Sequence, residues 1–180
     1  MKSKKQTINK KENLEKLKEN WLKELSKYGI LKKDYEDANK NLTKRFGKKV
    51  AVSDIIWSLF NQAIIKNIND PTKLSNIYFD MGRFIRIEGK NDPNLYFEQS
   101  TRALLQQYKK SGIKKIRFVA SYGKRTCKSC SKLNGKIFDI EDALKNVPVP
   151  NKACKNLDDN RYRYCRCTII ALTELDDENK

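Results

Sequence analysis

Five cysteines are the residues of this sequence best suited to chemistry, and all of them fall between Cys127 and Cys167. They occur as Cys127-Lys-Ser-Cys130, as Cys154, and as Cys165-Arg-Cys167, in a chain without histidine. Two groups of thiols at the ends of a loop are typical of a tetrahedral zinc site, because each group supplies ligands on a tight turn and the ion closes the loop. We therefore expect one structural zinc ion per chain.

Five thiols are one more than a tetrahedral ion needs. In an extended strand, Cys165 and Cys167 would share a face with their Cα atoms about 6.6 Å apart. Two sulfurs on one zinc ion lie only about 3.8 Å apart, so both cysteines can bind it only if the strand bends. We expect Cys127, Cys130, Cys154 and one of the last two to bind zinc, and the spacing leaves open which one. Four thiolates leave no position for water, so the site is expected to be closed and structural.

A disulfide framework, an iron–sulfur cluster and unrelated free thiols are the alternative interpretations of the cysteines. Disulfides are disfavoured by the odd number of cysteines and by the N-terminal sequence, Met-Lys-Ser-Lys-Lys, which lacks the apolar core of a secretion signal. We therefore expect a reducing compartment. The apolar runs are too short for a membrane span, so we also expect a soluble protein.

The net charge of +17 is concentrated at the two ends of the chain. Positive charges exceed negative ones by nine over residues 1–50, by two over 51–110 and by six over 111–180. Such a balance favours a polyanionic partner, although solvated lysine faces and genome composition also explain it. The candidate nucleic-acid contacts are the basic residues near the cysteines: Lys114, Lys115, Arg117, Lys124, Arg125, Lys128, Arg161, Arg163 and Arg166.

Hydrophobic periodicity predicts an α+β fold that is mostly helical. We expect a disordered basic arm (1–13), a helical hairpin (14–47), a helical bundle (53–112), a zinc-ribbon-like α+β domain (113–173) and an acidic tail (174–180). Helices are expected to begin at Ser53-Asp54, at Asp70-Pro71 and at Asp92-Pro93, with Phe46 and Leu95 among the buried residues.

After Gly112 the hydrophobic period changes to that of a strand, which leads into the first cysteine pair. Asn134-Gly135 predicts a hairpin turn, and residues 139–145 predict a short helix. A final strand over residues 164–173 is expected to carry the last two cysteines.

The order of motifs in this region has a counterpart in a known family. Residues 125–138 read Arg-Thr-Cys-Lys-Ser-Cys-Ser-Lys-Leu-Asn-Gly-Lys-Ile-Phe, followed by Pro148-Val-Pro150 and Cys165-Arg166-Cys167. Over about residues 100–172 this resembles the C-terminal cysteine domain of phage minor head proteins of the Mu F (head morphogenesis) type. The resemblance implies a non-catalytic, metal-stabilised module of phage head assembly or DNA packaging, located in the bacterial cytoplasm or the virion. Related domains occur in small bacterial proteins, and residues 14–47 resemble the SHOCT-type helical hairpin.

The absence of histidine removes the commonest general base and the Cys–His nucleophile pair. A Mg²⁺-dependent nuclease would instead need carboxylates that converge on one site. The candidates are Asp80, Glu88, Asp139, Glu141 and Asp142. We expect no enzyme, and three functions are compared: an assembly module, a zinc-stabilised DNA- or RNA-binding protein, and a nuclease.

Overall fold

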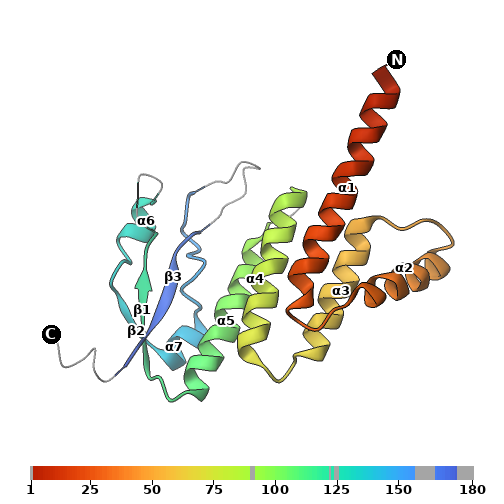
Figure 1. Ribbon diagram of the computed structural model, residues 1–180. Helices are drawn as coiled ribbons and strands as arrows, with labels where there is room; N and C mark the ends of the chain where they lie inside the picture. The colour runs from red at the N-terminus through yellow and green to blue at the C-terminus, as the bar shows by residue number, and fades with distance from the viewer. Residues whose placement is uncertain (1, 90–91, 122, 124–125, 157–164, 174–180) are drawn as a thin grey trace. The chain divides into compact units, whose positions relative to one another are not determined.

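The computed structural model describes residues 2–89, 92–121, 123, 126–156 and 165–173. The chain divides into two compact units, residues 1–68 and 69–180, whereas the sequence predicted a boundary after residue 112. Seven helices and one small antiparallel sheet in the described part confirm the α+β, mostly helical class (Figure 1). None of the described helices combines the length and apolarity that crossing a membrane requires.

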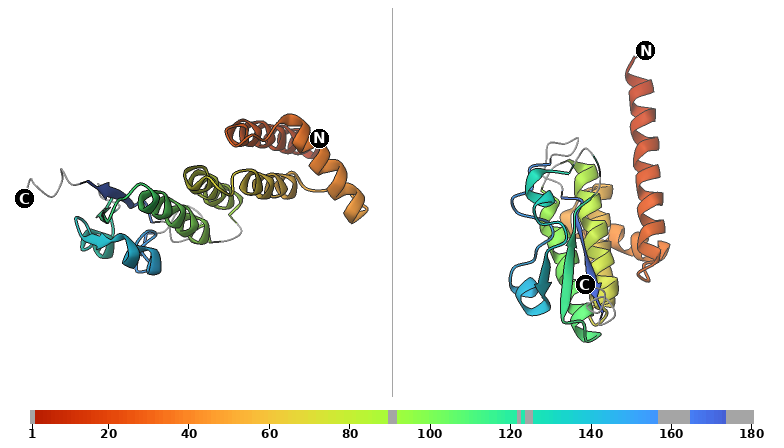
Figure 2. Two further views of the ribbon diagram at one scale, coloured as in Figure 1. Left: turned by 90° about the horizontal axis from the view of Figure 1, so that it is seen from below. Right: turned by 90° about the vertical axis from the view of Figure 1, so that its left-hand side faces the viewer.

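The first unit contains three helices: α1 (Lys2–Ser26), α2 (Lys32–Phe46) and α3 (Val52–Lys66). Both α1 and α2 pack on α3, and the Trp21 ring of α1 meets the Phe60 ring edge-on at 5.5 Å. The N-terminal part of α1 continues past the end of α3 (Figures 1 and 2). The predicted disordered arm is therefore helical from Lys2, because lysine, glutamine and glutamate have high helix propensity.

The end of α3 holds the turn between α1 and α2. Lys66 Nζ donates to the Gly29 carbonyl at 2.9 Å, and the buried Asn67 side chain donates to the Tyr28 carbonyl at 3.1 Å. At the start of α2, the Leu31 N–H donates to Asp34 Oδ2 at 2.6 Å. These bonds satisfy backbone groups that the turn would otherwise leave without a helical partner.

Two expectations for this unit were wrong. Helix α3 begins one residue before Ser53, with Ala51 at the N-cap and no side-chain cap bond. Phe46 is 56% exposed rather than buried, because it is the last residue of α2. The Arg45 guanidinium lies over its ring, 5.7 Å from the ring centroid. An apolar residue at the right period is buried only where another element faces it.

The second unit begins with two packed helices, α4 (Pro71–Glu88) and α5 (Asn94–Lys110). The predicted cap of α4 is confirmed, since the Asp70 side chain accepts a bond from the Lys73 N–H at 3.0 Å with proline at the first helical position. Helix α5 differs, because Pro93 is its N-cap residue and Asp92 Oδ1 accepts from the Asn94 N–H.

The contact between α4 and α5 is close at Gly82. A Cβ atom at this position would lie 2.6 Å from the Phe97 ring, so only glycine lets the ring pack here without a shift. Phe97 is buried, whereas Leu95 is 60% exposed, which contradicts its predicted burial. The predicted burial of Leu105 in the same helix is confirmed, so the sequence period failed only in the first turn, where Phe97 is the residue that packs against α4.

The sheet of this unit has the order β2-β1-β3, with β1 (Lys115–Val119) between β2 (Ile137–Asp139) and β3 (Thr168–Leu172). Both pairs are antiparallel, with Phe118 opposite Ile169. Gly135, at φ 80°, forms the predicted turn before β2, and its N–H donates to the Phe118 carbonyl at 2.9 Å.

One face of β1 is buried in the core of the unit and the other carries charge. Ile116 and Phe118 belong to the same buried cluster as Leu105 of α5, while Lys115 and Arg117 alternate with them on the opposite face. Two short helices, α6 (Lys128–Ser131) and α7 (Ile140–Lys145), complete the unit. The sheet and these helices thereby hold the cysteine-bearing segments against α5.

Candidate metal centre

Three separate segments bring the cysteines together. Cys127 is the N-cap residue of α6, and Cys130 lies within that helix. Cys154 lies in a turn that follows the proline-rich segment, and its backbone N–H donates to the Asn151 carbonyl at 2.8 Å. Cys165 and Cys167 precede β3, which begins at Thr168, so the prediction that a strand carries them was wrong. The irregular backbone provides the bend that both thiols need in order to face one centre.

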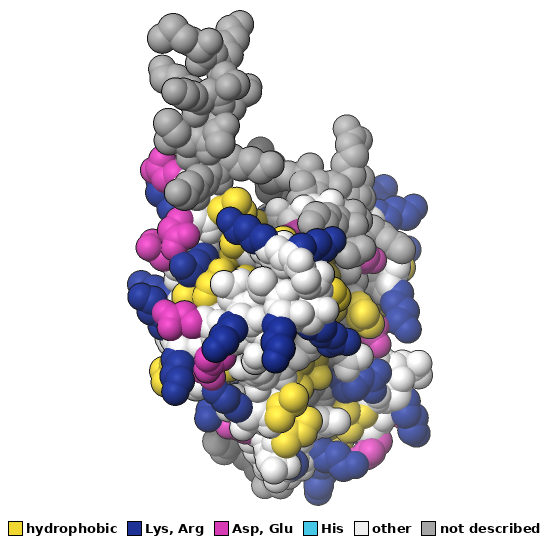
Figure 3. All heavy atoms as spheres, turned by 90° about the vertical axis from the view of Figure 1, so that its right-hand side faces the viewer, with side chains coloured by type: hydrophobic (Ala, Val, Ile, Leu, Met, Phe, Trp, Pro, Cys, Tyr) yellow, Lys and Arg dark blue, Asp and Glu magenta, His cyan; other side chains and the backbone are white. Residues whose placement is uncertain are grey.

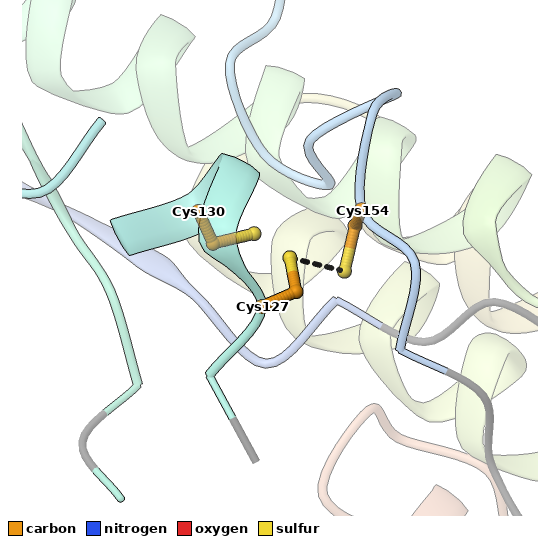
Figure 4. A group of neighbouring side chains, drawn as sticks. All are labelled: Cys127, Cys130 and Cys154. Atoms are coloured by element: carbon orange, nitrogen blue, oxygen red, sulfur yellow. Dashed lines mark hydrogen bonds between the residues drawn. The ribbon is translucent and has the colours of Figure 1, made fainter. Parts of the chain in front are cut away.

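The sulfur atoms lie at distances that suit a shared ion. Figure 4 shows the side chains of Cys127, Cys130 and Cys154 pointing toward one another. The Sγ atoms of Cys127 and Cys154 are 3.7 Å apart, and those of Cys130 and Cys165 are 3.9 Å apart. Two sulfurs on one tetrahedral zinc ion lie about 3.8 Å apart.

All five thiols form two overlapping triads. Cys127, Cys130 and Cys154 make one, Cys130, Cys165 and Cys167 make the other, and within each triad the Sγ atoms lie within 4.8 Å of one another. Cys130 belongs to both triads. Four of the five cysteines are buried, and Cys127 is partly exposed.

The centre is continuous with the hydrophobic core of the second unit. Cys130, Cys154, Cys165 and Cys167 belong to one buried cluster with apolar residues of α5, β1, α7 and β3. Burial of a thiolate is costly, and a cation at the centre would offset that cost for the sulfurs that bind it.

Two polar residues that the sequence analysis did not single out connect the cysteine segments. Ser129 Oγ lies 3.0 Å from Cys127 Sγ and 2.8 Å from the Ala153 carbonyl oxygen, within hydrogen-bond reach of both. Asn151 Nδ2 donates to Cys130 Sγ at 3.5 Å, while its Oδ1 accepts from the Ala153 N–H at 3.0 Å. Asparagine after Pro150 is a turn signal in the sequence, because its side chain can bond the backbone two residues on, whereas nothing in the sequence marks Ser129.

The environment shifts the thiol pKa values in opposite directions. Burial acts to raise the pKa of Cys127, but hydrogen bonds from Ser129 and from the backbone N–H of Lys155 and Cys130 outweigh it and lower the pKa to about 6. A hydrogen bond from Cys167 lowers the pKa of Cys165 to about 5.

The pKa values of the other three thiols are raised. Burial raises the pKa values of Cys130 and Cys154, and the bond to Cys165 together with burial raises that of Cys167. A bound dication would favour ionisation of its ligands.

The donor set fits a soft or borderline metal ion. In the part of the chain that the structure describes, both groups of closely spaced potential ligands consist of cysteine alone. Thiolate donors at tetrahedral spacing suit zinc and exclude the oxygen coordination that Mg²⁺ and Ca²⁺ prefer.

The predicted basic contacts fall into separate places. Lys115 and Arg117 share the outer face of β1, and Lys114 precedes that strand. Lys128 and Arg166 are each next in sequence to cysteines of the centre, and both are exposed. Lys124, Arg125, Arg161 and Arg163 lie outside the described residues. On the face that Figure 3 shows, basic side chains are interspersed with acidic and hydrophobic ones.

The candidate carboxylates are engaged in different parts of the unit. Asp80 is buried on α4 and accepts from Arg83 at 2.8 Å. Glu141 pairs with Lys109 at 2.7 Å, and Asp142 pairs with Lys145 at 3.5 Å. Neither of the two metal-capable groups found among the described residues includes a carboxylate.

Comparison with known proteins identifies the family. A family model described as "Phage Mu protein F like protein" matches residues 33–170. No curated protein and no solved structure matches the chain. The family match confirms the resemblance seen in residues 100–172 and extends it into the first unit. Because it covers well over half of the sequence, the chain belongs to the phage Mu protein F like family.

Proposed function

We propose that this chain is a non-catalytic component of phage head morphogenesis whose second unit is stabilised by one structural zinc ion. The observation that carries the proposal is the convergence of five cysteines from three segments within the core of that unit, in a member of the phage Mu protein F like family.

Structural zinc explains how so small a core is held together. The three-stranded sheet has strands of three to five residues, and the cysteine segments around it are largely irregular. Small domains with limited cores often depend on a metal, and the binding free energy of a structural zinc is coupled to folding. Four thiolates complete the coordination sphere, which leaves no open position for a catalytic water.

Metal analysis of the native full-length chain tests this proposal. We expect one zinc ion per chain, and its removal by a chelator should increase hydrogen exchange in residues 113–156 while residues 12–66 keep their protection. Cys127→Ser should have the same effect, whereas Ser131→Ala, an exposed change in the same helix, serves as the matched control. A native chain without zinc, or with iron in its place, would contradict the proposal.

The assembly role has its own test in particles purified from cells that produce the phage. Mass spectrometry should find the chain in those particles, and Cys127→Ser should reduce its incorporation while Ser131→Ala should not. A chain that stays entirely in the lysate would contradict an assembly role.

The basic residues support a contact between this module and packaged nucleic acid. Lys115 and Arg117 point to the outer face of the sheet, away from the buried cluster, in a chain of net charge +17. Replacing both by alanine should weaken DNA binding equally for all sequences and reduce the salt dependence of log Kd by about two units. The control is the double variant Lys73→Ala and Lys16→Ala, which removes two positive charges from α4 and α1 and should leave the affinity for DNA unchanged. An unchanged salt dependence would leave a protein partner as the assembly contact.

A further inference from the structure

The fifth thiol distinguishes this centre from a four-cysteine zinc site. Cys127, Cys130 and Cys154 form a complete triad on one side, so the ion needs only one further sulfur. Both remaining cysteines can supply it, because Cys165 and Cys167 lie within 4.8 Å of Cys130 and of each other at Sγ.

We propose that Cys165 is the fourth ligand and that Cys167 is a reserve ligand, which replaces Cys165 when that thiol is lost. The inference rests on the proposed zinc site. Cys165 is assigned first because its Sγ lies 3.9 Å from that of Cys130, close to the separation of about 3.8 Å for two sulfurs on one zinc ion. The replacement requires the Cys167 sulfur to move toward the position of the Cys165 sulfur, and these two Sγ atoms lie within 4.8 Å of each other.

The local backbone allows this exchange. Cys167 directly precedes Thr168, which is paired with Val119 and so keeps the segment beside the centre. Residues 165–167 lie outside the strand, so their conformation is not fixed by strand pairing. A groove of about 450 Å³ borders Cys165 and Cys167, with Phe97 and Thr101 of α5 among its lining residues. The segment therefore has space to shift while β3 stays in place.

The arrangement gives the centre tolerance to the loss of one particular thiol. If Cys165 is removed, Cys167 restores four-sulfur coordination. Cys127 has no such substitute, because the Cys167 sulfur shares a triad with that of Cys165 and shares none with that of Cys127. The prediction is therefore asymmetric between thiols that are chemically alike.

Zinc X-ray absorption, which counts sulfur ligands, and chelator competition, which measures affinity, test the inference on the full-length chain. The wild type and Cys167→Ala should each hold one zinc with four sulfurs at similar affinity. Cys165→Ala should keep four sulfurs, with affinity reduced by about 10- to 100-fold. The double variant should fall to three sulfurs, as should Cys127→Ala, which makes the same chemical change at a thiol without a reserve.

A second measurement needs no variant that affects folding. In the zinc-loaded wild type, iodoacetamide followed by peptide mapping should label Cys167 and leave the other four cysteines protected. Three sulfurs in Cys165→Ala, or labelling of Cys165 in place of Cys167, would overturn the inference. A wild type that holds no zinc would refute the proposed function itself, so the two failures are distinguishable.

Discussion

Gly82→Ala is a direct test of the packing between α4 and α5. The new Cβ atom would lie 2.6, 2.8 and 2.9 Å from three carbons of the Phe97 ring. Carbon atoms prefer separations of at least about 3.5 Å, so the ring must retreat by about 0.9 Å. Phe97 is only 6% exposed, and its ring also packs against Phe79 at 5.5 Å between centroids. The retreat therefore disturbs a buried contact.

The expected magnitude is the difference between two opposing effects. Overpacking a buried site costs about 1–3 kcal/mol, whereas replacing glycine by alanine inside a helix gains about 1 kcal/mol. The net result is a loss of about 1 kcal/mol in the free energy of opening α4 and α5. In a Phe97→Leu background, which lacks two of the three clashing carbons, the same change should stabilise the helices by about 1 kcal/mol.

Native-state hydrogen exchange of the α4 and α5 amides measures the change in opening free energy that Gly82→Ala causes in the wild type and in the Phe97→Leu background. Asn76→Ala, an exposed change on the same helix, is the control for helix propensity alone. The double-mutant cycle should give a coupling of about 2 kcal/mol between positions 82 and 97. If Gly82→Ala stabilises the wild type as much as it stabilises Phe97→Leu, the close contact does not exist.

Two further predictions concern single hydrogen-bonding side chains. Asn67→Ala should lower the free energy of unfolding of the first unit by about 1–3 kcal/mol, because the Tyr28 carbonyl loses its buried donor. Urea unfolding followed by tryptophan fluorescence measures this, and an effect no larger than that of exposed Asn61→Ala would contradict it. In metal-free protein, Ser129→Ala should raise the pKa of Cys127 above about 6, and the midpoint of its alkylation by iodoacetamide should rise with it. Because folding lowers the pKa of Cys127, its thiolate stabilises the metal-free unit at high pH, and this stabilisation should disappear as the pH falls through about 6. An unchanged alkylation midpoint in Ser129→Ala would contradict the role of Ser129.

Local signals in the sequence predicted the elements whose formation depends on neighbouring residues. Asp70-Pro71 begins a helix because the side chain accepts a backbone bond three residues on, and Gly135 turns the chain because it adopts a positive φ. The grouping of the cysteines followed from the same kind of reasoning, since each pair is separated by only one or two residues.

Features that depend on distant partners were not predictable in this way. The hydrophobic period of α5 fits burial of Leu95 about as well as burial of Phe97. Phe97 is the buried one, and its ring occupies the space beside Gly82 of α4 that a side chain at that position would fill. The spacing of Cys165 and Cys167 suggested a strand, but pairing with β1 begins only at Thr168. The contact of Ser129 with Ala153 joins residues 24 positions apart, which no local pattern specifies.

The order of the cysteines along the chain determines when the centre can form during synthesis. About 40 residues separate Cys127 from Cys167, which corresponds to about 2–8 s of translation. During that interval Cys127 and Cys130 have already been synthesised, whereas Cys165 and Cys167 have not. Strand β1 also still lacks its neighbour β3. The three helices of the first unit are complete by then. A newly made chain therefore passes through a stage at which all residues of the first unit have been synthesised and the leading thiols are still accessible to competing ions.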